Sequence, residues 1–309
     1  MSNRRKFLQQ MGTGALLLGA NSFPLDAFAN YDSEKLTILH TNDWHSRIDP
    51  FPMDGGKYQG LGGVATRASL IQKLRAAADN VLLLDAGDIF QGTPYFNYYH
   101  GELEMKLMSQ MQYDASAIGN HDFDNGVGGL AAALPHATFP LICSNYDFTN
   151  TAMQGKTITY KIFKKGKIKI GVFGLGIELK GLVPEKMFGE TKYLEPISIA
   201  NTIAAQLKHE EKCNIVICLS HLGYKYQDKK ISDEIFAQST SNIDLIIGGH
   251  THTFFDAPVS YKNSEGKQVL VNQVGWAGLV LGKIDFYFKK NLIEKQATSS
   301  TVIVTTNPN

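Results

Sequence analysis

Five short segments of this sequence combine side chains that could bind divalent metal ions. Each follows a run of apolar, β-prone residues and offers carboxylate, amide or imidazole groups. The segments are Asp43-Trp-His45, Gly87-Asp88, Gly119-Asn-His-Asp122, Ser220-His221 and Gly248-Gly-His-Thr-His252. Oxygen and imidazole ligands suit zinc and the neighbouring divalent transition metals, so the shared placement of these segments predicts a two-metal hydrolytic site.

Each segment has a simpler interpretation when it is taken alone. An Asp after a strand commonly caps a helix, and Gly-Asp or Asn-His-Asp occurs in ordinary turns. Five of the nine histidines nevertheless lie in these segments. Loops at the ends of neighbouring strands converge, as a chelating site requires. The ligands we predict are Asp43, His45, Asp88, Asn120, His221, His250 and His252.

The elements that must position these segments alternate between strand and helix. Apolar runs predict strands over 36–40, 81–84, 139–143, 215–218 and 243–247, with a hairpin over 158–173. Apolar residues at helical spacing predict helices over 62–78, 102–111 and 196–209. Because no internal repeat or linker interrupts this alternation, the simplest expectation is one α/β domain over 30–309.

Composition sets further bounds on the function. A chain of 309 residues with 43% hydrophobic content can bury a sizeable core. Its formal net charge of +1 gives no reason to expect a nucleic-acid polymer as partner. The three cysteines are scattered and form no Cys-x-x-Cys pair, which favours buried free thiols over a disulfide framework.

Residues 1–29 are typical of an export signal. Arg4-Arg5 stands before Lys-Phe-Leu, a short apolar stretch follows from Met11 to Ala20, and Ala27-Phe-Ala29 provides a cleavage site. This arrangement predicts export of the folded protein by the twin-arginine route to the periplasm or beyond. An ordinary secretory signal with two chance arginines is the alternative. The apolar stretch is shorter than the ~20 residues that a membrane anchor needs.

The order of D-x-H, GD-x-x-x-G, GNHD, SH and GHTH motifs resembles the calcineurin-like metallophosphoesterases. A closer similarity, to the catalytic domain of bacterial periplasmic 5′-nucleotidases, extends from about Leu36 to about Phe288. It rests on His40-Thr-Asn-Asp43, Gly62-Gly-Val-Ala-Thr-Arg67, Tyr113-Asp114, Asn120-His-Asp-Phe-Asp124 and the segment 272–282. The resemblance implies a four-layer αββα sandwich of two mixed β-sheets flanked by helices. Ser46 and Asp122 depart from the usual motifs, but neither position is a metal ligand in the family.

The resemblance also implies a role for each predicted residue. One ion would be held by four residues: Asp43, His45, Asp88 and His252. Asp88 would bridge to a second ion, which Asn120, His221 and His250 would complete. Asn120 and His121 would contact the substrate. His121 would stabilise charge on the phosphoryl group or the leaving oxygen, with Asp124 orienting its ring; the alternative is that His121 supports the site without touching substrate.

These roles predict hydrolysis of phosphate monoesters. Two divalent ions exceed the negative charge of Asp43 and Asp88 by two, which suits a phosphate ester dianion. Metal binding lowers the pKa of water to about 7, so a metal-bound hydroxide is the expected nucleophile. Manganese or zinc is the expected metal, with iron and cobalt left open, because mixed nitrogen and oxygen ligands suit all four.

The expected substrates are nucleotides, and 2′,3′-cyclic nucleotides are a further expectation. Two-domain 5′-nucleotidases read the base with a C-terminal domain, whereas this sequence ends at Asn309. We therefore expect either a separate polypeptide that supplies this domain or recognition mainly through the phosphate. Two other functions remain open: a thiosulfohydrolase on the same scaffold, and a non-catalytic subunit of a nucleotidase complex.

Overall fold

Two six-stranded mixed β-sheets form the centre of the computed structural model, which describes residues 16–18, 34–289, 292 and 295–305. In the first sheet β2 (Glu34–Thr41) pairs in parallel with β3 (Val81–Asp85) and antiparallel with β13 (Val280–Phe288). Its strands, in spatial order, are β1 (Leu16–Leu18), β14 (Lys295–Ile303), β13 (Val280–Phe288), β2 (Glu34–Thr41), β3 (Val81–Asp85) and β4 (Ala115–Ser116).

The second sheet has parallel pairs at its centre and antiparallel pairs at both edges. In spatial order its strands are β11 (Val259–Lys262), β12 (Gln268–Asn272), β10 (Leu245–Gly248), β9 (Ile215–Ser220), β7 (Ile168–Leu175) and β6 (Tyr160–Lys165). A separate two-stranded ribbon joins β5 (Tyr146–Asp147) and β8 (Lys192–Tyr193).

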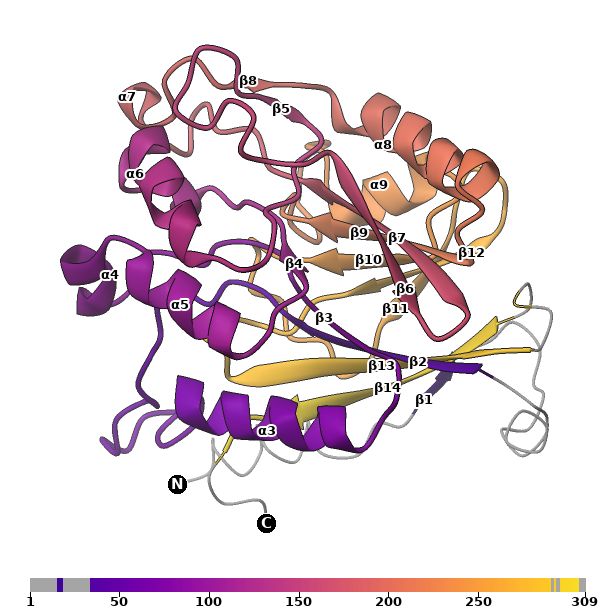
Figure 1. Cartoon of the computed structure of the whole chain (residues 1–309), viewed down its shortest axis with the longest axis horizontal. Helices are drawn as coiled ribbons and strands as arrows, with labels where there is room; N and C mark the ends of the chain where they lie inside the picture. The colour runs from indigo at the N-terminus through magenta and orange to yellow at the C-terminus, as the bar shows by residue number, and fades with distance from the viewer. Residues whose placement is uncertain (1–15, 19–33, 290–291, 293–294, 306–309) are drawn as a thin grey trace.

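Helices cover the outer face of each sheet. The first sheet is covered by α3 (Val64–Ala76), α5 (Glu102–Gln110) and α6 (Gly126–Ala133), and the second by α8 (Pro196–Ala205) and α9 (Asp233–Ser239). Figure 1 shows α3 below the first sheet and α8 above the second. Shorter elements are α4 (Pro94–Tyr99), α7 (Glu185–Phe188), the 3₁₀ turns His121–Phe123 and Leu134–His136, and a π-helical turn at Gln206–Glu210.

The alternation of side chains along each strand explains why four layers form. In β3, Leu82 and Leu84 point between the two sheets, whereas Val81 and Leu83 point towards the helices over the first sheet. Successive strand residues face opposite sides of a sheet, so an uninterrupted apolar run is buried on both. The predicted αββα sandwich is therefore confirmed.

The predicted strand over 139–143 is wrong. This segment makes only isolated bridges, from Leu141 to Ser116 and from Ile142 to Ile158. Its neighbour β4 is two residues long, so no ladder can extend along it. Leu141 and Ile142 are buried in different core clusters, and the apolar pattern therefore reflects the burial of an irregular segment.

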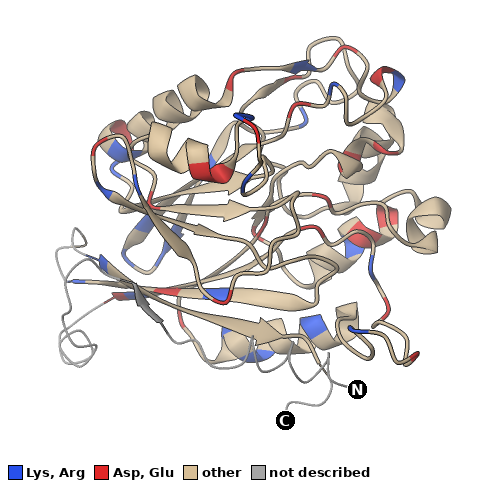
Figure 2. Cartoon of the chain, turned by 180° about the vertical axis from the view of Figure 1, so that it is seen from behind, with Lys and Arg blue, Asp and Glu red and all other residues tan. Residues whose placement is uncertain are grey.

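Most of the predicted export signal lies outside the described residues. Three of its residues form β1, which occupies the edge of the first sheet beside β14. Within the described part of the chain, every helix is too short or too polar to cross a membrane. Basic and acidic residues are interspersed along the ribbon in Figure 2, in keeping with a net charge near zero. The three cysteines are buried free thiols, as predicted.

Candidate metal centre

All five chemistry-bearing segments lie just beyond the carboxyl ends of strands. They follow β2, β3 and β4 of the first sheet and β9 and β10 of the second. Within each sheet these strands run parallel to one another, so their carboxyl ends lie at the same edge. Side chains more than 200 residues apart in the sequence are thereby brought together.

Six of the seven predicted ligands form two compact groups. Asp43, His45 and His252 make one group, and Asp88, His221 and His250 make the other; within each, one ligand atom per residue lies within 4.8 Å of the others. The seventh predicted ligand, Asn120, places its Oδ1 2.8 Å from Nδ1 of His250. The predicted ligands are thus all assembled at one place.

The carboxylate of Asp88 lies between the two groups. Its Oδ2 is 3.0 Å from Nε2 of His221 and 3.9 Å from Nε2 of His45. Asp43 Oδ1 is similarly 3.3 Å from Nε2 of His252 and 3.9 Å from Nε2 of His221. The two groups therefore form a single centre with carboxylate oxygens in its middle.

Buried groups at this centre fit a bound cation. Nε2 of His221 is buried and makes no hydrogen bond, although Asp88 Oδ2 is close to it. Burial lowers the pKa of His221, but the negative charge of Asp88 outweighs this and raises it to about 10. In Asp88, burial favours the neutral acid, yet His221 and His45 shift its pKa downward overall. A divalent ion would stabilise the carboxylate and use the orphaned imidazole nitrogen as a ligand.

The backbone that carries these side chains is strained. Five of the predicted ligands have a positive φ, between 50° and 70°: Asp43, His45, Asp88, His250 and His252. For residues other than glycine this conformation is unfavourable and clusters at functional sites. Gly87, with φ 90°, allows the closest approach, because a Cβ there would lie 2.6 Å from the amide nitrogen of Gly119.

Asp122 holds the two central loops in place. Its Oδ2 accepts hydrogen bonds from the amides of Gly119 and Asp88, and its Oδ1 accepts from those of Ile89 and Phe90. Burial and the nearby Asp88 charge raise the pKa of Asp122 to about 7. The Asp122 side chain therefore ties the loop after β3 to the loop after β4.

His121 and Asp124 form a pair beside the centre. Nδ1 of His121 lies 2.8 Å from Oδ2 of Asp124, and this hydrogen bond raises the pKa of the imidazole. The ring centroid of His121 is 5.2 Å from that of His45. The side chain of His121 is 39% exposed, so a bound molecule could reach it.

From the sequence we predict no role for two residues at the centre, although both lie in segments that carry the family resemblance, His40-Thr-Asn-Asp43 and 272–282. Asn42 donates hydrogen bonds to Asp43 Oδ2 and to the carbonyl of Gly275, which fixes the carboxylate. Trp276 stacks on the ring of His252. The contacts of Asn42 and Trp276 depend on long-range folding, so no local spacing could have revealed them.

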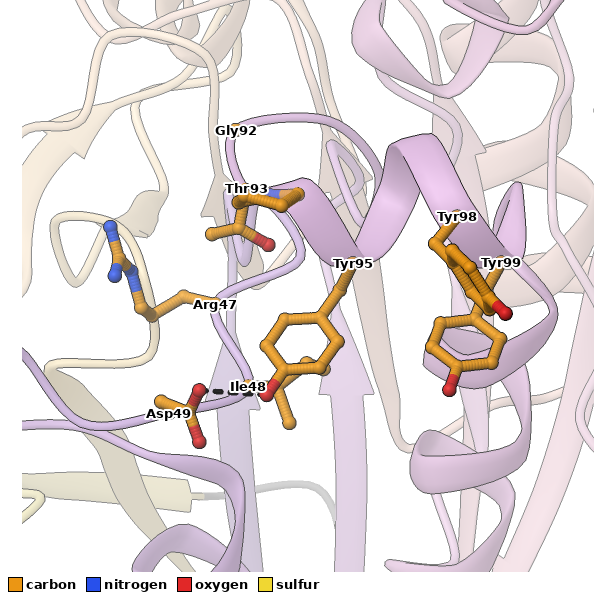
Figure 3. Close-up of a pocket in the computed structure, with 9 residues that line it drawn as sticks. Arg47, Ile48, Asp49, Gly92, Thr93, Tyr95, Tyr98 and Tyr99 are labelled. Atoms are coloured by element: carbon orange, nitrogen blue, oxygen red, sulfur yellow. Dashed lines mark hydrogen bonds between the residues drawn. The ribbon is translucent and has the colours of Figure 1, made fainter.

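An open pocket of about 620 Å³ lies between residues 47–49 and α4 (Figure 3), and none of the predicted ligands lines it. Gly92 lines it and packs against His45, since a Cβ at Gly92 would lie 3.0 Å from the Cβ of His45. Tyr95, Tyr98 and Tyr99 contribute from α4, and Tyr95 donates a hydrogen bond to Asp49. Its volume lies in the range of small-molecule sites.

Comparison with known proteins yields one consistent family. The model of the calcineurin-like phosphoesterases matches residues 36–254. A snake venom 5′-nucleotidase from Gloydius brevicauda is 35% identical over 306 residues, which cover 90% of this chain and 50% of the relative. The human 5′-nucleotidase is 32% identical, over 84% of this chain and 48% of the relative. The chain thus spans about half the length of these relatives.

Solved structures give the same result. A 5′-nucleotidase precursor from Thermus thermophilus superposes with a TM-score of 0.77 at 32% identity, covering 87% of this chain and 54% of that one. The sulfate thiohydrolase SoxB from Thermus thermophilus superposes with a TM-score of 0.71 at 17% identity, over 87% and 56%; this likeness shows the fold alone. The chain is a member of the calcineurin-like phosphoesterase family.

Proposed function

We propose that this protein hydrolyses phosphate monoesters at a centre that holds two divalent ions, with 5′-nucleotides as substrates. The observation that supports this most is the position of Asp88 between two groups of ligands. A carboxylate in this position can bridge two ions. Asn120 joins the second group through its contact with His250.

In this proposal the bound ions and the residues around them have separate roles in the reaction. When bound, the ions supply positive charge to the phosphoryl oxygens and lower the pKa of the attacking water to about 7. Nδ1–H of His121 donates a hydrogen bond to Asp124, which raises the pKa of the imidazole and so favours the protonated ring. In that form Nε2–H can donate towards the phosphoryl group or the leaving oxygen. The neutral side-chain amide of Asn120 would contact the phosphoryl group as well. Manganese or zinc fits this donor set best in our proposal, with iron and cobalt also compatible.

The proposal of nucleotide substrates has two supports. The named relatives are 5′-nucleotidases, and the pocket between residues 47–49 and α4 presents Tyr98 and Tyr99 as aromatic surface. Base stacking on such rings contributes on the order of 1–3 kcal/mol. A separate polypeptide that takes part in base recognition is also proposed, as is activity on 2′,3′-cyclic nucleotides.

We also propose export by the twin-arginine route, with cleavage after Ala29 and a single catalytic domain over 30–309. Because β1 lies at a sheet edge, cleavage would leave the other five strands of its sheet paired. The protein would then act in the periplasm or outside the cell. Fusion of residues 1–33 to a reporter, with Arg4-Arg5 replaced by lysines, tests the route; unchanged export would favour an ordinary secretory signal.

A hydrolysis screen of the purified mature chain tests the activity. It compares 5′-AMP, 2′,3′-cyclic AMP, p-nitrophenyl phosphate and a thiosulfate-bearing peptide, each with Mn²⁺, with Zn²⁺ or with EDTA. Selective, EDTA-sensitive release of phosphate from 5′-AMP is the expected result. Cleavage of p-nitrophenyl phosphate alone would point to a missing recognition subunit. Turnover of the thiosulfate peptide alone would identify a thiosulfohydrolase, and binding of metal without any turnover would identify a non-catalytic subunit.

A further inference from the structure

The histidines of the centre differ in what fixes their rings. Nδ1 of His221 lies 2.7 Å from the carbonyl oxygen of Ala86, and Nδ1 of His45 lies 3.3 Å from that of Phe90. Such a hydrogen bond to the second ring nitrogen normally sets the orientation of a ligating imidazole. No described protein group makes this contact with Nδ1 of His252, whose Nε2 faces Asp43 and His45.

An aromatic ring lies against His252 instead. The Trp276 and His252 rings are nearly parallel, with an angle of 7° and centroids 5.6 Å apart. This is an offset stack of the kind that aromatic pairs prefer. The side chain of His252 is 39% exposed. The His252 ring also contacts Asp43 and the edge of the His45 ring, both of which are predicted ligands themselves.

Trp276 is itself held rigidly. The amide of Gly275 donates to the carbonyl of Thr253, and the amide of Ala277 donates to that of Asp43. Both neighbours of Trp276 are therefore tied to the segments that carry the metal ligands. Because the backbone of Trp276 is fixed in this way, its side chain can restrict the orientation of a ring stacked on it.

We propose that Trp276 is a positioning residue for the metal centre: it holds the His252 imidazole with Nε2 directed at the Asp43 group, in the role that a hydrogen bond plays for His221. The inference rests on the proposed two-metal function. It predicts that the aromatic plane of Trp276, rather than its bulk alone, sets the affinity of the ion bound by the Asp43 group.

Two substitutions distinguish the effect of the aromatic ring of Trp276 from the effect of its side-chain volume. Trp276→Leu fills much of the space without an aromatic ring, whereas Trp276→Phe keeps a ring that can stack. The metal-free full chain is titrated with Mn²⁺ by calorimetry, which measures affinity and stoichiometry without reference to turnover. We expect Trp276→Leu to weaken one of two ions by roughly 10- to 100-fold, and Trp276→Phe to stay within about threefold of the parent.

Phe51→Leu is the matched control. Phe51 packs against Trp276 and against the Arg47 guanidinium, but it is not stacked on any predicted ligand ring. Circular dichroism melting in EDTA verifies that each variant is folded. We expect Phe51→Leu to bind both ions as the parent does.

Three results would overturn the inference: parental affinities at both sites in a folded Trp276→Leu variant, equal weakening in Phe51→Leu, or failure of Trp276→Phe to restore affinity. If Trp276→Leu does not fold, Trp276→Met takes its place, because it also fills the space without an aromatic ring; parental affinity at both sites in the folded Met variant would overturn the inference, and weakening of one ion would support it. A parent chain that binds two ions but hydrolyses no ester would refute the proposed activity and leave the Trp276 effect measurable.

Discussion

In the proposed mechanism, His121 serves the reaction without binding metal. Its amide donates to Asp88 Oδ1 at 2.8 Å, and its ring is oriented by Asp124. The backbone of His121 thus supports the centre, while its partly exposed imidazole remains available to a bound phosphate. These two functions can be separated by substitution, because truncating the side chain leaves the backbone contact in place.

We predict that His121→Ala retains both ions and slows hydrolysis of 5′-AMP by roughly 10²- to 10⁴-fold, the usual contribution of a proton-donating side chain. The loss should be smaller for p-nitrophenyl phosphate, whose leaving group needs less help. Turnover of both esters is measured together with metal content. His136→Ala is the control, since His136 also faces an acidic residue, Glu102, but lies away from the centre. Loss of an ion from His121→Ala would show that His121 belongs to the metal shell.

At the scale of elements, the loops after β3 and β4 act as one unit because Asp122 joins them. One carboxylate accepts four amide hydrogen bonds there. We predict that Asp122→Asn lowers the free energy of unfolding by roughly 2–4 kcal/mol, since an amide has a single acceptor oxygen and leaves buried N–H groups without partners. Chemical unfolding in EDTA measures this loss apart from metal binding.

Asp228→Asn is the control for this loop effect, because Asp228 accepts one amide bond, from Lys230, in an exposed loop. We expect its free energy of unfolding to change by less than about 0.5 kcal/mol. Equal stability losses in the two variants would mean that Asp122 is no more than an ordinary turn residue.

The elements also show what the sequence could predict and where it failed. β3 and β9 are apolar runs that end at Asp85 and Ser220, and such runs are recognisable because both faces are buried. The helix α6 was missed because its sequence begins with three glycines in four residues and its stability comes from packing of Leu130 and Ala131. The predicted ligands could be chosen from motifs, whereas the contact of Trp276 with His252 arises only when β10 and β12 pair and their loops meet.

At the scale of the whole molecule, the centre joins the two halves of the sandwich. Asp43 and Asp88 extend from the first sheet, and His221 and His250 extend from the second. Between the sheets lies an apolar core formed by strands of both. An ion that binds ligands from both sheets therefore links them at one edge, and it should stabilise their association in addition to its role in catalysis.

We predict that removal of metal lowers the melting temperature of the chain. A ligand that binds only the folded state, at a hundred times its Kd, contributes about 2.7 kcal/mol, so EDTA should lower Tm by roughly 5–10 °C relative to a Mn²⁺-loaded sample. Asp88→Asn removes the carboxylate shared by the two groups and should abolish most of this difference, together with activity. His136→Ala, which leaves both groups intact, should retain it. If the melting temperature of the parent chain responds to neither EDTA nor Mn²⁺, the assignment of ligands from both sheets to bound ions is contradicted. A full response in Asp88→Asn would contradict only the bridging role of Asp88, because the remaining ligands would then hold both ions without a shared carboxylate.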